Sequence, residues 1–242
     1  MIHTRRGFGG ACAAPHHLAA QAGRDILRDG GNAIEAMVAM AATIAVVYPH
    51  MNGIGGDGFW LIKRPGLAPL AIDACGPAAG LASREFYAEH GHGYAADSEG
   101  AAPLANGSSI PTRGPLSALT VAGTIGGWQE ALAFSAETSA DERSPLPLST
   151  LLSHAIRHAN DGVAVSASQK ALSEKHLAVL SQQPGFAERY LGQSESGEPI
   201  ALEEGARLRQ PALAATLSRL ADAGLDDFYR GELATRMAQE LE

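Results

Sequence analysis

A short glycine-rich run between a helical and a strand-like segment constrains this chain more than any other feature. Gly53, Gly55 and Gly58 have the G-x-G-x-x-G spacing of a dinucleotide-binding loop. Such a loop binds a pyrophosphate only where a strand ends and a helix begins. Here residues 33–47 predict a helix before the glycines, and residues 59–62 predict a strand after them. The order argues against a nucleotide site. It leaves close backbone packing, positive φ or free amides directed at a ligand as explanations for the glycines.

Composition and charge exclude several classes of partner. The 242 residues are 45% hydrophobic, which is enough for the core of a single domain spanning residues 1–242. A net charge of −8 with scattered Lys and Arg argues against a nucleic acid or an anionic membrane as partner. Cys12 and Cys75 are too few for a disulfide framework or a C-x-x-C metal site, so we expect no metal and no cofactor. The longest apolar run, residues 36–47, is too short to cross a bilayer, and we expect a cytoplasmic location.

Local signals predict a mixed first half and a helical second half, which together indicate an α+β fold. We expect a buried strand at residues 8–14, and a helix to Arg28 that the following Asp-Gly-Gly ends. A second helix follows, with Asn32 and Glu35 as a capping box. Further on, we expect a hairpin of residues 59–64 and 69–73, a strand at 117–121, and helices beginning at 126 and spanning 149–159, 166–180, 211–223 and 228–241.

Several residue pairs could be read as catalytic or metal sites. His154 and His158 have the spacing of two zinc ligands on a helix, but Arg157 lies between them and argues against a metal. His16 and His17 stand at a predicted helix start, where capping or packing is the simpler interpretation. Cys75 as a hydrolase nucleophile lacks a histidine nearby in the sequence.

Four blocks of sequence resemble the γ-glutamyltranspeptidase-like family of N-terminal nucleophile (Ntn) hydrolases. The most specific is D-G-G-N-A-I-E-A at residues 29–36, with A-A-P-H-H-L-A-A at 13–20 before it. The others are G-I-G-G-D-G-F at 53–59, G-P-L-S-A-L-T-V-A-G at 114–123 and D-F-Y-R-G-E at 227–232. The resemblance spans essentially the whole chain. It implies a four-layer αββα sandwich of two sheets covered by helices.

The resemblance also implies a mechanism and a partner. The precursor of such a protein cuts itself and exposes a Thr at the N-terminus of a small subunit, and that Thr attacks an amide carbonyl. We therefore expect this chain to be the large-subunit portion of an amidohydrolase. It would contain no catalytic residue of its own, would pair with the small subunit from the same precursor, and could form a dimer of such heterodimers.

One departure from the family pattern bears on the substrate. In transpeptidases proper, an Arg in a D-x-R-E context pairs with the glutamyl α-carboxylate, and Cys75 stands where that Arg would fall. A thiol cannot replace a bidentate guanidinium. Arg113 is the nearest candidate cation, and Asp57 in the glycine run could orient the substrate or cap the turn. We therefore predict substrate contacts from Arg113, Cys75 and Asp57.

The substrate that fits this departure best is a small non-glutamyl amide such as oxamate. Three alternatives stay open on the sequence alone. The first is a true γ-glutamyltransferase or glutathione hydrolase that holds the carboxylate with other residues. The second is a cephalosporin-acylase-like enzyme, and the third is a non-catalytic scaffold relative.

Overall fold

The computed structural model describes residues 7–90, 110, 115–118, 120–138 and 144–241. The chain divides into two compact units. Unit 1 comprises residues 1–54 and 128–242, and unit 2 comprises residues 55–127. A single domain over residues 1–242 stays a prediction.

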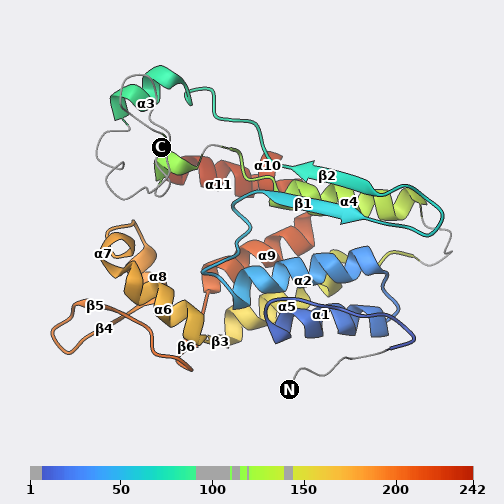
Figure 1. Ribbon diagram of the computed structural model, residues 1–242, viewed down its shortest axis with the longest axis horizontal. Coiled ribbons are helices and arrows are strands. Elements are labelled where there is room, and N and C mark those ends of the chain that lie inside the picture. The colour runs from blue at the N-terminus through green and yellow to red at the C-terminus, as the bar shows by residue number, and fades with distance from the viewer. Residues whose placement is uncertain (1–6, 91–109, 111–114, 119, 139–143, 242) are drawn as a thin grey trace. The chain divides into compact units, whose positions relative to one another are not determined.

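Unit 1 is built around a central helix that is buried on nearly all sides. This helix, α2 (Ala33–Val47), packs against α1 (His17–Arg28) and α5 (Leu148–Asp161), and α5 packs in turn on α9 (Pro211–Ala223) (Figure 1). The alanines of α2 let neighbouring backbones approach closely. Its larger side chains Val38, Val46 and Val47 are at most 2% exposed. Burial of each such side chain contributes about 1.5–3 kcal/mol.

The turn between α1 and α2 follows its local sequence signals. Gly30 has φ 92°, and the N–H groups of Gly30 and Gly31 donate to the carbonyls of Leu27 and Ile26 at 3.2 and 2.8 Å. These two bonds form a Schellman motif. Asn32 and Glu35 form the expected capping box at the start of α2. Both predicted boundaries are therefore confirmed.

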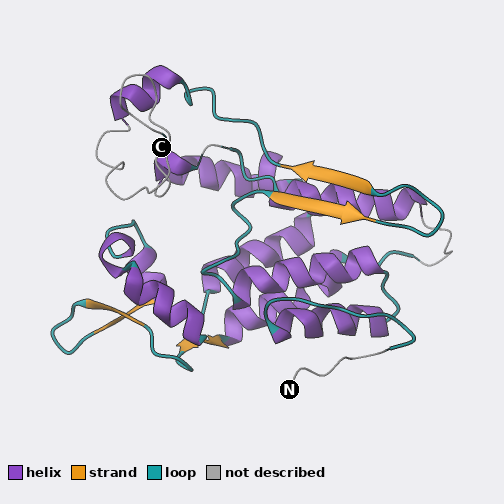
Figure 2. Cartoon of the chain, in the orientation of Figure 1, coloured by secondary structure: helices purple, strands orange, loops and turns teal. Residues whose placement is uncertain are grey.

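The remainder of unit 1 is less uniformly helical than the sequence predicts (Figure 2). Its helices are α4 (Thr124–Thr138, from Trp128 onward), α6 (Ala167–Lys175), α7 (Leu177–Leu180), α8 (Phe186–Tyr190), α10 (Asp227–Arg230) and α11 (Glu232–Leu241). Short antiparallel pairs join β3 (Val163–Ala164) to β6 (Arg207–Leu208) and β4 (Leu191–Gln193) to β5 (Pro199–Ala201).

Two predicted helices are each divided in the structure. The helix expected at 166–180 breaks at His176, whose ψ of 13° departs from helical geometry and which serves both as the C-cap of α6 and as the N-cap of α7. The helix expected at 228–241 breaks at Gly231. There the Asp227 carboxylate accepts hydrogen bonds from the N–H groups of Glu232 and Leu233, each at 3.3 Å. A Cβ on Gly231 would lie 2.0 Å from that carboxylate, so the break needs glycine.

Unit 2 contains the predicted hairpin. Strands β1 (Gly58–Ile62) and β2 (Leu70–Ala74) pair antiparallel, with Gly58 opposite Ala74 and Ile62 opposite Leu70. Trp60 faces the first turn of α4, and a Cβ on Gly127 would lie 3.1 Å from its indole nitrogen. Phe59 and Leu61 point the other way and are 72% and 79% exposed. Unit 2 also contains α3 (Arg84–His90) and a 3₁₀ turn, η2 (Pro115–Ser117).

Two predicted strands are wrong. Residues 8–14 are irregular, and Phe8 is fully exposed, because no described strand lies beside them to complete a ladder. Of residues 117–121, Leu119 lies outside the described residues, and Ser117 ends the 3₁₀ turn. Thr120 forms a single bridge to Ala78. Pro115, at the start of the 3₁₀ turn just before this segment, favours a turn over a longer ladder.

Candidate functional site

The close approach of two chain segments in unit 2 creates the candidate site. Residues 120–124 run against the end of β2, where a Cβ on Gly76 would lie 2.0 Å from the carbonyl oxygen of Val121. A Cβ on Gly123 would lie 2.0 Å from the carbonyl oxygen of Ala74. Real Cβ atoms do not approach oxygen so closely, so both positions need glycine. This packing brings residue 120 alongside the residue that follows β2.

Three side chains from distant parts of the sequence meet there, and we call them the Asp57 cluster: Asp57, Cys75 and Thr120. The Thr120 hydroxyl donates to Oδ1 of Asp57 at 2.8 Å. The Cys75 thiol hydrogen-bonds with the Asp57 carboxylate and also interacts with Thr120. The Cys75 N–H donates to Oδ1 of Asp73 at 3.0 Å, which fixes the backbone just after β2. Asp57 and Cys75 are exposed and Thr120 is half-buried, so the cluster is open to a ligand.

The surroundings of Cys75 favour its protonated form. The hydrogen bond with Asp57 is the largest cause that raises the pKa of the thiol, followed by desolvation and the negative charge of Asp57. A thiolate is the nucleophilic form of cysteine. A raised pKa therefore argues against Cys75 as a hydrolase nucleophile and favours a role as a neutral hydrogen-bonding group.

The glycine run lies beside the Asp57 cluster, and hydrogen bonds from Thr124 hold its backbone. The carbonyl oxygen of Gly56 accepts from the N–H and the hydroxyl of Thr124 at 2.9 and 2.8 Å. None of the glycines from 53 to 58 has positive φ, so that explanation is wrong. Gly58 lies close to the backbone of Thr124, whereas Gly55 and Gly56 have open space where a Cβ would stand. Close packing thus explains Gly58, and Gly55 and Gly56 leave the face of the loop uncovered within the described chain.

The candidate residues from the sequence have different outcomes. The structure brings Asp57 and Cys75 together, whereas Arg113 lies outside the described residues. Substrate binding by all three residues stays a prediction. Thr120 was missed. In the sequence, Thr120 is a polar residue within the otherwise apolar run L-T-V-A of a family block. That pattern marks Thr120 as unusual but does not identify Asp57 as its partner.

The histidine pairs have structural partners in unit 1. Nδ1 of His16 accepts from the N–H of Leu18 at 3.3 Å, which is the capping role that was the simpler interpretation. His154 lies 3.5 Å from Asp25, and burial is the main cause that lowers the pKa of both His154 and His158. Within the described ranges, no group of three or more His, Cys, Asp or Glu side chains could hold a metal ion. These observations favour packing over metal binding.

Tyr48 and His50 lie near the start of α6. The rings of Tyr48 and His50 are 4.1 Å apart, and Nε2 of His50 lies 3.1 Å from the hydroxyl of Ser168. Burial lowers the pKa of His50. Nδ1 of His50 is buried and has no hydrogen-bond partner in the part of the chain that the structure describes. Packing around His50 therefore favours the neutral imidazole.

Comparison with known proteins places this geometry in a fold and then in a family. A γ-glutamyltranspeptidase from Pseudomonas nitroreducens, solved in complex with L-DON, superposes with a TM-score of 0.73 at 32% identity. The superposition covers 96% of this chain and 60% of that one. The α+β fold class expected from the sequence is thereby confirmed. Residues 19–242 match the model of the gamma-glutamyltranspeptidase family, and the chain belongs to that family.

Two curated relatives extend the comparison. The oxamate amidohydrolase proenzyme of Klebsiella pneumoniae is 52% identical over 232 residues, which are 96% of this chain and 39% of that protein. The glutathione hydrolase-like YwrD proenzyme of Bacillus subtilis is 34% identical over 95% of this chain and 38% of its own length. The chain thus spans about two fifths of the length of these relatives.

Proposed function

We propose that this chain is the large-subunit portion of a self-processed amidohydrolase that hydrolyses oxamate. The observation that carries the substrate assignment is the presence of a cysteine at position 75. Cys75, whose thiol pKa is raised by the Asp57 carboxylate, occupies the place where the family resemblance expects a guanidinium. An Asp57–Cys75 pair offers no positive charge to a glutamyl α-carboxylate. The similarity to an oxamate amidohydrolase proenzyme at 52% identity supports the same substrate.

The proposed reaction uses a nucleophile from outside this chain. The N-terminal Thr of the small subunit attacks the amide carbonyl of oxamate, its own α-amine takes the hydroxyl proton, and ammonia leaves with a proton. Water then hydrolyses the oxalyl ester and releases oxalate. In this scheme Arg113 holds the substrate carboxylate, and the Asp57 carboxylate accepts a hydrogen bond from the amide N–H. Cys75 and Thr120 hold Asp57 in place.

The proposed partner is the small subunit produced from the same precursor. Relatives that carry the word proenzyme in their names support a precursor that is cleaved. Within unit 2, Phe59 and Leu61 form an apolar face of the hairpin that is 72% and 79% exposed. Neighbouring exposed apolar side chains of this size are typical of an interface. We assign the outer face of β1 to contact with the small subunit.

The location of the protein stays a prediction. Among the described residues, every helix is too short or too polar to cross a membrane. The proposal includes the cytoplasmic location and the dimer of heterodimers that the sequence led us to expect.

Processing and turnover of the full-length protein test the proposal. We expect two fragments on a denaturing gel, a Thr at the N-terminus of the smaller one by Edman sequencing, and release of ammonia from oxamate. Uncut protein without activity would favour the scaffold alternative. Cut protein that releases no ammonia from oxamate would retain the family mechanism and reject the substrate.

A further inference from the structure

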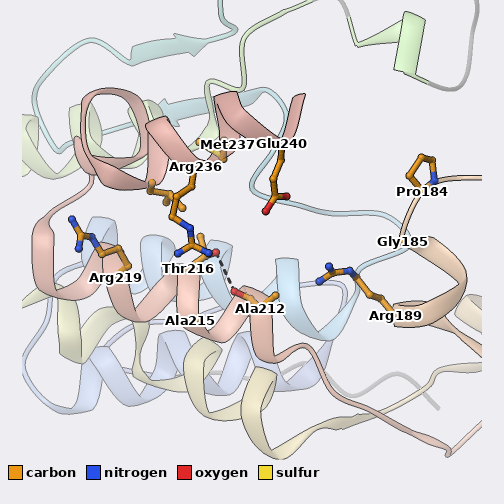
Figure 3. Close-up of a pocket in the computed structure, with 11 residues that line it drawn as sticks. Pro184, Gly185, Arg189, Ala212, Ala215, Thr216, Arg219, Arg236, Met237 and Glu240 are labelled. Atoms are coloured by element: carbon orange, nitrogen blue, oxygen red, sulfur yellow. Dashed lines mark hydrogen bonds between the residues drawn. The ribbon is translucent and has the colours of Figure 1, made fainter. Parts of the chain in front are cut away.

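A cavity in unit 1 lies between α9, α11 and the turn that leads into α8 (Figure 3). Its volume is about 560 Å³. That volume falls within the range of small-molecule sites, about 300–1,000 Å³. The floor is formed by Ala212, Ala215 and Thr216 of α9, and Met237 of α11 adds an apolar wall. The cavity shares no residue with the Asp57 cluster.

One wall of the cavity is fixed by an ion-pair network. Arg219 donates to both carboxylate oxygens of Asp227 at 3.0 and 2.9 Å and to Glu232 at 2.8 Å. The Asp227 side chain is only 7% exposed. The network joins α9 to the start of α11 and neutralises Arg219, so this residue shapes the cavity without supplying a free charge.

Two other arginines at the cavity have no such partner. Arg189 on α8 and Arg236 on α11 make no ion pair with any described residue, and both side chains are exposed. Figure 3 shows their guanidinium groups extending from opposite sides toward the α9 floor. Glu240, one turn beyond Arg236, also borders the cavity but forms no ion pair with it. Glu240, Asp227 and Glu232 together balance the charge of the three arginines. Among the described residues, however, only Arg219 of the three is held in an ion pair, so Arg189 and Arg236 are the two guanidiniums that can bind an anionic ligand.

From this arrangement we infer that the cavity binds a small aliphatic dicarboxylate. Each guanidinium has a planar fork that matches one carboxylate group. Arginines on opposite sides favour a ligand with a carboxylate at each end over one with a single anionic group. The alanines and Met237 between them accommodate a short hydrocarbon chain. The Thr216 hydroxyl already donates to the carbonyl of Ala212 at 3.1 Å, so its oxygen adds no free donor for the ligand.

Calorimetric titration of the full-length protein with succinate tests this inference, with acetate and inorganic phosphate as comparison ligands at low ionic strength. We expect succinate to bind, and acetate to bind at least about tenfold more weakly because it engages one guanidinium only. Arg189→Gln and Arg236→Gln should each weaken succinate binding by about tenfold or more. Arg236→Lys, which keeps the charge and loses the fork, should fall between the wild type and Arg236→Gln.

The matched control is Arg207→Gln, which removes an exposed arginine of the same unit that does not line the cavity. It should leave succinate affinity unchanged. Melting curves would show that each variant is folded. An absence of succinate binding, an equal affinity for phosphate, or an unchanged affinity in both cavity variants would overturn the inference.

Discussion

Gly123→Ala is the substitution that most sharply tests how unit 2 forms the candidate site. The added Cβ would lie 2.0 Å from the carbonyl oxygen of Ala74 and 3.3 Å from the N of Gly76. Carbon and carbonyl oxygen normally stay about 3.3 Å or more apart. One of the two backbones must therefore move by about 1 Å, and overpacking of this kind costs about 1–3 kcal/mol.

The same displacement should reach the Asp57 cluster. Thr120 lies on the same segment as Gly123, and Cys75 directly follows Ala74, whose carbonyl oxygen the new Cβ would meet. A displacement of about 1 Å at a substrate-positioning group can reduce turnover by about a hundredfold. We expect Gly123→Ala to lower both the free energy of unfolding in urea and kcat/KM for oxamate.

Gly80→Ala provides the matched control in the same unit. A Cβ at Gly80 would have no atom within 4 Å, and its φ is not positive. This variant should change stability by less than about 0.5 kcal/mol and leave turnover unaffected. If Gly123→Ala behaved like Gly80→Ala in both assays, the close approach of the two segments would not exist in the protein.

Three further predictions concern single side chains. Glu35→Gln should cost about 1.5–3 kcal/mol in urea unfolding. The two carboxylate oxygens of Glu35 each accept from a different backbone N–H at 2.7 Å, and in Gln an NH₂ donor would face one of those N–H groups. The exposed Glu130→Gln should cost less than about 0.5 kcal/mol. Burial is the main cause that lowers the pKa of His158 in the folded state, so its contribution to stability is present above its unfolded pKa of about 6.5 and is lost as the pH falls toward the folded value. His158→Gln should therefore flatten the decline of Tm below that pH, and an unchanged Tm profile would refute this assignment. Asp57→Asn removes the negative charge that helps to raise the pKa of Cys75. Iodoacetamide should therefore alkylate Cys75 faster at about pH 8, which peptide mass spectrometry would measure. An unchanged rate would show that the two side chains do not interact.

Much of the local structure is predictable from short-range signals. The capping box at Asn32 and the glycine turn after Arg28 depend on residues within one helical turn, and the structure has both. The hairpin is similarly signalled by Pro65 and Gly66 between two apolar runs. Such signals need no knowledge of distant residues, which is why they succeed.

The features that sequence reasoning missed depend on long-range partners. The strand-like residues 8–14 form no strand because a ladder requires a neighbour, which apolar character alone cannot supply. The break at Gly231 depends on the Asp227 carboxylate, whose position is fixed by Arg219 on another helix. Neither partner can be identified from the periodicity of the segment itself.

The candidate site combines both kinds of information. Asp57 is indicated by its place in the glycine run, and Cys75 by its place where the family has a guanidinium. Their contact required the hairpin register that places Gly58 opposite Ala74, so that the residues just before β1 and just after β2 become neighbours. Thr120 joins them only because Gly76 and Gly123 allow the third segment to approach.

The specificity of the full-length protein tests the central claim most directly. The measurement is kcat/KM for ammonia release from oxamate, set against kcat/KM for hydrolysis of a γ-glutamyl anilide by the same preparation. With Cys75 rather than a guanidinium beside Asp57, oxamate should be the preferred substrate by about a hundredfold or more, since a site that lacks a needed charged partner loses several kcal/mol of binding. A γ-glutamyl anilide hydrolysed as efficiently as oxamate would contradict the account.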